Sequence, residues 1–87
     1  MANKIRVLVV DDNLNFLQLA QMALGTDDYE VHTATDGSDG FDQARLVKPD
    51  VILMDVMMPR VSGLELMRML LSDDELKLIP ILVMTAS

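Results

Sequence analysis

The chain has 87 residues, enough for one small domain, and its 14 acidic and 7 basic residues give a formal net charge of -7. This balance argues against a protein that binds the nucleic-acid backbone, because such proteins need clustered Lys and Arg. The absence of cysteine excludes a disulfide framework and a thiolate metal site. No apolar run is long enough for a bilayer and no secretory leader follows the first residues, so we expect a single cytoplasmic domain over residues 1–87.

Short apolar runs of strand length recur along the chain. Residues 5–10 and 51–54 are apolar almost throughout, which is typical of strands covered on both faces, and aspartate follows each of them. Residues 29–33 alternate like an edge strand, and residues 81–84 form a fourth strand.

Helical spacing fills the segments between these runs. The expected buried stripes are Leu14, Leu17, Gln21 and Leu24 in the first helix, Phe41, Ala44 and Val47 in the second, and Leu64, Met67, Leu70 and Leu71 in the third. Asn13, Ser38 and Ser62 are the predicted N-caps. Alternating strands and helices predict a parallel α/β sheet with right-handed crossovers.

Three aspartates follow two of the predicted strands. Sites in open parallel sheets form beyond the carboxyl ends of the strands, so Asp11, Asp12 and Asp55 converge if the first and third strands are neighbours. Mutual repulsion of about 1–4 kcal/mol per pair then calls for a counter-charge. An all-oxygen ligand set favours Mg²⁺, and a carboxylate beside such a cation is a nucleophile toward phosphorus. The alternative, that each aspartate only caps the loop after its strand, stays open.

Other polar or soft residues receive simpler interpretations. We expect His32 to be structural or solvent-facing, without a partner in reach. The methionines at 54, 57 and 58 are interpreted as packing residues rather than a soft-metal site. The acidic run at residues 73–75 is expected to be a solvated loop.

The whole chain resembles the receiver domain of response regulators from two-component signalling. The stretches that carry the resemblance are VLVVDD at 7–12, ATDG at 34–37, KPDVILMDVMMP at 48–59, SGLELM at 62–67 and IPILVMTA at 79–86. It implies a flavodoxin-like fold with strand order 2-1-3-4-5, of which this chain would contain 2-1-3-4. Ser62 stands where the family often has Asp.

The resemblance also implies a function. Asp55 would accept a phosphoryl group from a phosphohistidine of a sensor histidine kinase or phosphotransfer protein. Asp12 and Asp55 would bind Mg²⁺ directly, Asp11 through water, and Met57 through its backbone carbonyl. Thr85 would be the switch hydroxyl and Ala86 its small neighbour, while Met57 and Ser87 would influence the lifetime of the acyl phosphate. Such a domain is not an enzyme beyond its own phosphorylation and dephosphorylation.

The family pattern continues past the last residue of this sequence. A fourth helix, a fifth strand with a lysine and a fifth helix would follow Ser87, so we expect a receiver that is C-terminally truncated after its fourth strand. Without that lysine, phosphorylation should be slow, because removing a preorganised charge donor costs on the order of 10²–10³ in rate. The open edge of residues 81–84 should pair with another copy or a complementing fragment.

Two alternative functions remain at this stage. One is a phosphorylation-independent interaction or assembly module with the receiver fold. The other is a metal-dependent phosphohydrolase with an aspartate nucleophile, but residues 55–57 read Asp-Val-Met and offer no second carboxylate. Neither direct nucleic-acid binding nor membrane binding is expected.

Overall fold

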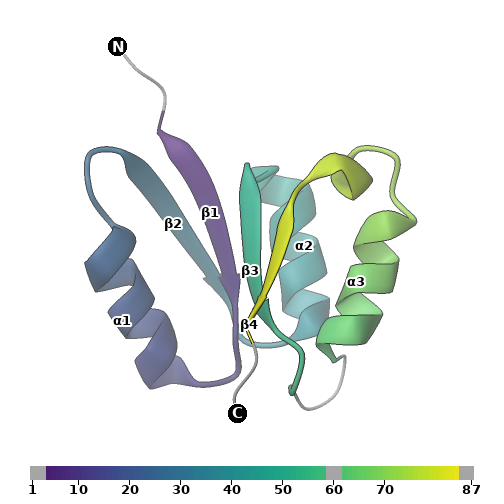
Figure 1. The fold of residues 1–87 in the computed structure, drawn as a ribbon, viewed down its shortest axis with the longest axis horizontal. Coiled ribbons are helices and arrows are strands. Elements are labelled where there is room, and N and C mark those ends of the chain that lie inside the picture. Colours follow the sequence, from purple (N-terminus) through teal and green to yellow (C-terminus); the bar gives the residue numbers. More distant parts are fainter. Residues whose placement is uncertain (1–3, 59–61, 85–87) are drawn as a thin grey trace.

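The computed structural model describes residues 4–58 and 62–84. Strands and helices alternate along this part of the chain, and a short 3₁₀-helix precedes the last strand. Their bounds are β1 Ile5–Val10, α1 Leu14–Leu24, β2 Tyr29–Ala34, α2 Gly37–Val47, β3 Val51–Asp55, α3 Gly63–Leu71, the 3₁₀-helix Leu76–Leu78 and β4 Ile81–Met84. The strands run parallel in the order β2-β1-β3-β4 (Figure 1). The predicted α/β fold and strand order are confirmed.

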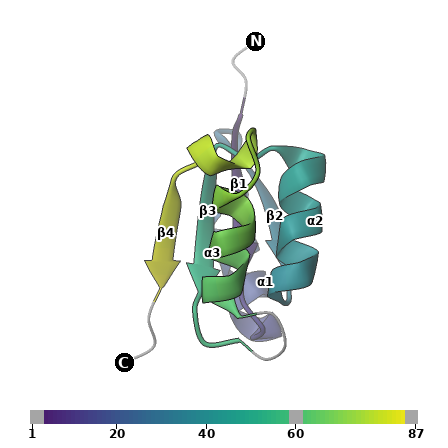
Figure 2. The same cartoon turned by 90° about the vertical axis from the view of Figure 1, so that its right-hand side faces the viewer.

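β1 lies in the middle of the sheet, which accounts for its apolar sequence. Alternate side chains of a strand point to opposite faces. Leu8 and Val10 belong to the core beneath α2 and α3, whereas Val7 and Val9 pack with Leu17 of α1. Figure 2 shows α2 and α3 on one side of the sheet and α1 on the other. β1 is therefore covered on both faces, as its sequence predicts.

Two of the three predicted N-caps are confirmed. The side chain of Asn13 accepts a hydrogen bond from the Phe16 N–H at 3.2 Å, and that of Ser62 accepts one from the Glu65 N–H at 3.3 Å. Each satisfies a backbone donor that has no partner within its helix.

None of the helices that the structure describes is long and apolar enough to cross a membrane.

The prediction of Ser38 as the cap of α2 is wrong. The helix begins at Gly37, and Asp36 caps it by accepting the Asp39 N–H at 2.8 Å. Asp and Ser are about equally good caps, so two candidates close together in sequence do not reveal which one begins the helix. The helix ends at Val47, and the chain turns at Lys48, which has a φ of 52°.

The predicted buried stripes are correct only in part. Of the predicted residues, Leu17, Ala44 and Leu70 are buried, whereas Leu14, Leu64 and Leu71 are exposed. Leu66 of α3 is fully buried although the predicted stripe did not include it. Each helix lies on one face of the sheet, so only a limited arc of its surface is covered. Apolar spacing alone does not indicate which arc that is.

The acidic run at residues 73–75 is more ordered than a solvated loop. The carboxylate of Asp73 accepts hydrogen bonds from the N–H groups of Glu75 and Leu76, at 2.9 and 3.0 Å. Leu76 is buried at the start of the 3₁₀-helix. The run therefore fixes the turn that leads from α3 into β4.

β4 is an edge strand that is only partly covered. It pairs with β3 on one side, and within the described residues no strand pairs with its other side. The side chains of Leu82 and Val83, which point to opposite faces, leave the residues 57% and 43% exposed. The open edge expected for residues 81–84 is thus present in the part of the chain that the structure describes.

Candidate functional site

The three aspartates predicted to converge do so at the carboxyl end of the sheet. Asp11 and Asp12 follow β1, and Asp55 ends β3. These strands pair in parallel, with Val10 opposite Met54, so both carboxyl ends lie together. Each aspartate offers a carboxylate oxygen, and these oxygens lie within 4.8 Å of one another. Neighbouring parallel strands thus bring distant parts of the sequence into one acidic cluster.

Two of these carboxylates are oriented by the loops that follow their strands. Asp11 Oδ1 accepts the Asn13 N–H at 2.9 Å, and Asp55 Oδ1 accepts the Met57 N–H at 3.0 Å. Asp and Asn side chains commonly hydrogen-bond the backbone two residues on. The loop-capping alternative is thus correct for two of the aspartates. It does not account for the convergence of the three carboxylates in one cluster.

Burial and like charge make this cluster unfavourable when it is fully ionised. Asp11 is only 9% exposed. Burial raises the pKa of Asp11, the Asn13 N–H opposes this, and the charges of Asp55 and Asp12 raise that pKa further. No Lys or Arg forms an ion pair with the three aspartates in residues 4–58 and 62–84. The counter-charge that the cluster requires is not provided by this part of the chain.

The donor set fits a hard divalent cation. All three side chains offer oxygen, and Asp12 is exposed, which leaves room for water and a further ligand. Mg²⁺ prefers this arrangement, because it binds through one or two carboxylates and keeps several waters. Met57, predicted to contribute its carbonyl, lies in the same loop as Asp55.

The predicted packing role of the methionines is correct for two of them. Met54 and Met58 are buried in the core beneath α2 and α3. Met57 is exposed, so its interpretation as a packing residue is wrong. Its backbone is engaged by Asp55 while its side chain extends from the loop into solvent.

The predicted switch residues, Thr85 and Ala86, lie outside the described residues, as does Ser87. The described part of β4 nevertheless ends beside the cluster. Met84, its last residue, is the register partner of Asp55. Thr85 follows Met84 directly in the sequence.

The prediction that His32 has no partner is wrong. Its Nε2 lies 2.7 Å from Glu30 Oε2, and Arg6 Nε lies 3.8 Å from the same oxygen. The hydrogen bond with His32 is the main cause that lowers the pKa of Glu30. Residues two apart on a strand share a face, so the spacing of Glu30 and His32 was a signal for this pair. The pair lies on the edge strand β2 and contributes nothing to the acidic cluster.

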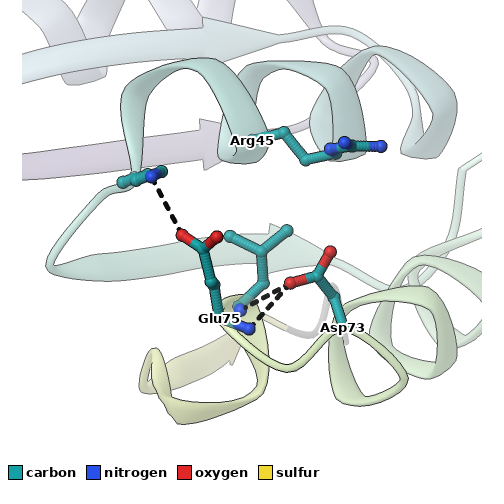
Figure 3. Close-up of a pocket in the computed structure, with 5 residues that line it drawn as sticks. Arg45, Asp73 and Glu75 are labelled. Atoms are coloured by element: carbon teal, nitrogen blue, oxygen red, sulfur yellow. Dashed lines mark hydrogen bonds and ion pairs between the residues drawn. The ribbon is translucent and has the colours of Figure 1, made fainter.

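A pocket of about 250 Å³ lies at the opposite end of the sheet (Figure 3). Its lining consists of Arg45, Lys48, Asp73, Glu75 and Leu76. These residues come from the end of α2 and from the α3–β4 connection, which lead into the amino ends of β3 and β4. The acidic cluster lies at the opposite, carboxyl ends of β1 and β3.

An ion pair joins the two sides of this pocket. Lys48 Nζ lies 2.9 Å from Glu75 Oε2. Figure 3 shows Arg45, a residue of α2, on one side of the pocket and Asp73 on the other. The pocket's charged side chains therefore connect α2 to the α3–β4 connection. Sequence spacing gave no indication of this contact.

Comparison with known proteins identifies one family. The sequence model of the response regulator receiver domain matches residues 7–87. The polar-differentiation response regulator DivK of Brucella anthropi is 40% identical over 80 residues, which cover 92% of this chain and 65% of that protein. Hybrid signal transduction histidine kinase D of Dictyostelium discoideum is 44% identical over 84 residues, 97% of this chain and 5% of that protein. The chain thus spans less than two thirds of either relative.

The fold also matches solved structures. The chemotaxis response regulator CheY4 of Vibrio cholerae superposes with a TM-score of 0.87 at 34% sequence identity. The match covers 93% of this chain and 68% of the CheY4 chain.

Proposed function

Since this chain belongs to the response regulator receiver domain family, we propose that it is the phosphoacceptor of a two-component system, phosphorylated on Asp55. The phosphoryl donor would be a phosphohistidine on a sensor histidine kinase or phosphotransfer protein. The observation that carries this proposal is the convergence of Asp11, Asp12 and Asp55 at one end of the sheet. A similar domain within a hybrid histidine kinase supports the class of partner.

We assign Asp12 and Asp55 as direct ligands of Mg²⁺, Asp11 as a ligand through water and Met57 as a carbonyl ligand. Support comes from the oxygen-only donor set and from the lack of a protein cation beside it in the described residues. When bound, Mg²⁺ would neutralise negative charge on the carboxylates and the incoming phosphoryl group.

The reaction itself would be carried out by Asp55. The Met57 N–H holds Oδ1, and Oδ2 accepts no hydrogen bond from the described residues. Attack of the carboxylate on phosphorus forms an O–P bond while the N–P bond of the phosphohistidine breaks, and the departing imidazole takes up a proton. The domain would thus catalyse only its own phosphorylation and dephosphorylation.

We further propose that Thr85 hydrogen-bonds the phosphorylated aspartate and that Ala86 leaves room for this movement. The register pairing of Asp55 with Met84 supports the assignment, because Thr85 comes next in sequence. We also expect phosphorylation of the 87-residue chain to be slow. Its described Lys and Arg residues do not pair with the cluster, and a missing charge donor costs on the order of 10²–10³ in rate.

A second proposal concerns the edge of β4, which we expect to pair with a second copy of the chain. The exposed side chains of Leu82 and Val83 and the unpaired side of this strand in the described residues support it. Neither a charged residue nor a proline lies within β4 to discourage such pairing. A monomer in analytical ultracentrifugation at all concentrations would contradict this proposal.

The phosphoacceptor proposal is tested with acetyl phosphate as donor. Intact-mass spectrometry should show one phosphoryl group added slowly in the presence of Mg²⁺, and none with EDTA. Asp55→Asn should abolish the addition, whereas Asp42→Asn, an exposed position in α2, should leave it unchanged. Labelling that persists in Asp55→Asn would contradict the site assignment.

Two other results would favour the alternatives. Complete absence of labelling under all Mg²⁺ concentrations would indicate a phosphorylation-independent interaction module. Multiple turnovers of a phosphomonoester such as p-nitrophenyl phosphate would indicate a phosphohydrolase.

A further inference from the structure

Gly63 lies against the backbone that carries Asp55. It begins α3 and is buried. A Cβ added at Gly63 would lie 2.6 Å from the carbonyl oxygen of Asp55 and 2.5 Å from the Cα of Val56. Both neighbours are backbone atoms, so neither can rotate away as the end of a side chain can. The first turn of α3 therefore approaches this loop more closely than any residue with a side chain allows.

This close approach limits where the loop after β3 can lie. On one side the loop continues from β3, whose last residue pairs with β4. On the other side Gly63 lies so close to Asp55 and Val56 that a Cβ would clash with their backbone, and the next residue, Met57, donates its N–H to the Asp55 carboxylate. The start of α3 is itself fixed, because Ser62 caps it. A shift of α3 would therefore also move the Asp55 carboxylate and the Met57 carbonyl, which are assigned to the cation.

Gly40 offers a contrast within the same core. A Cβ there would lie 3.0 Å from Leu66 Cδ2 and 3.2 Å from both Val10 methyl carbons. These are side-chain atoms that yield by small rotations, and they belong to the core rather than to the loop of Asp55. The two buried glycines therefore serve different purposes.

We infer that Gly63 is a positioning residue for the Asp55 site. Its missing side chain lets α3 hold the Asp55–Met57 backbone where carboxylate and carbonyl oxygens face one cation. This inference rests on the proposed function, because it concerns the same site. It extends that function by assigning part of the site's geometry to a residue that offers no ligand.

The test compares Gly63→Ala with Gly40→Ala in the 87-residue chain. The Mg²⁺ dissociation constant is measured by calorimetry well below the melting temperature of each variant, and the Met57 amide is followed by ¹⁵N–¹H spectroscopy. Gly63→Ala should weaken Mg²⁺ binding about 10–100-fold, the usual effect of losing support behind a ligand, and should shift the Met57 amide. Gly40→Ala should change the melting temperature while keeping the Mg²⁺ affinity within about twofold of the original chain.

Gly63→Ala with unchanged Mg²⁺ affinity would overturn the inference. If Gly63→Ala does not fold, Ser62→Ala replaces it, because that change removes the hydroxyl that accepts the Glu65 N–H and weakens the start of α3 without adding atoms. Unchanged Mg²⁺ affinity in Ser62→Ala would then overturn the inference, and weaker binding would support it. Failure of the original chain to label with acetyl phosphate would overturn the phosphoacceptor function alone, since Mg²⁺ affinity and the Met57 amide still report on Gly63.

Discussion

Asp11 follows β1 and Asp55 ends β3, yet one carboxylate oxygen of each lies within 4.8 Å of the other. The charge of Asp55 adds to burial in raising the pKa of Asp11. In the absence of a cation the fold is therefore destabilised by the very groups that form the candidate site. Repulsion of this kind is worth about 1–4 kcal/mol per pair, depending on the local dielectric.

Asp11→Asn is expected to stabilise the metal-free protein at neutral pH. The change removes a buried charge but keeps an oxygen that can accept the Asn13 N–H. Each kcal/mol relieved should raise the melting temperature by about 4–8 °C in calorimetry of a domain this size. The same variant should gain less stability than the original chain when Mg²⁺ is added.

The gain from Asp11→Asn should depend on pH in a defined direction. Because the folded state raises the pKa of Asp11, it binds this proton more tightly than the unfolded state does, so the penalty is complete only above the raised pKa. It should fade as the pH falls through that value toward the ordinary 3.8. A gain that stays constant from neutral pH to pH 4 would contradict this account of Asp11.

Asp73→Ala should lower the melting temperature, because it removes the acceptor for the N–H groups of Glu75 and Leu76. Those hydrogen bonds lower the pKa of Asp73. Their contribution to the stability of the fold should therefore be present above the unfolded pKa of Asp73 and be lost as the pH falls through the lower folded pKa. Asp74→Ala is the matched control, since the Asp74 side chain is almost fully exposed and, among the described residues, bonds only Lys77. Equal effects of the two substitutions would contradict a specific role for Asp73.

Two leucines of α3 should respond very differently to truncation. Leu66 is fully buried, so Leu66→Ala should cost about 2–5 kcal/mol of unfolding free energy in urea titrations. Leu64 is exposed on the same helix, and Leu64→Ala should stay within about 0.5 kcal/mol of the original chain. Similar losses at both positions would mean that α3 is oriented differently.

Leu82→Lys should weaken the proposed pairing through β4. A charge on an edge strand discourages contact with a second strand, and Leu82 is exposed enough to accept one without disturbing the core. Sedimentation velocity should show a shift toward monomer. Leu46→Lys, an exposed change in α2, should leave the association unchanged. Association that persists fully in Leu82→Lys would place the contact elsewhere.

The features that could be predicted from sequence depend on local pattern. The apolar run of residues 5–10, with aspartates directly after it, was sufficient to place a covered strand and one side of the acidic cluster. Asn13 and Ser62 were identified because each is a good cap residue that stands directly before its helix. The convergence with Asp55 followed from the direction of parallel strands.

The missed features depend on tertiary contacts. Leu64 fits the helical spacing, but its exposure depends on which side of α3 meets the sheet. The close approach of Gly63 to Asp55 joins α3 to the end of β3, and the Lys48–Glu75 ion pair joins the end of α2 to the α3–β4 connection. Neither contact has a periodic pattern that would reveal it.

The two edges of the sheet differ in a way that would limit assembly. β2 carries Glu30 and His32, whereas β4 exposes Leu82 and Val83 and has no charged residue. Two copies joined at β4 about a two-fold axis would bury both apolar β4 edges, and only the charged β2 edges would remain exposed. Growth would therefore stop at a closed pair, and the same asymmetry would keep the sheet from extending into a fibre.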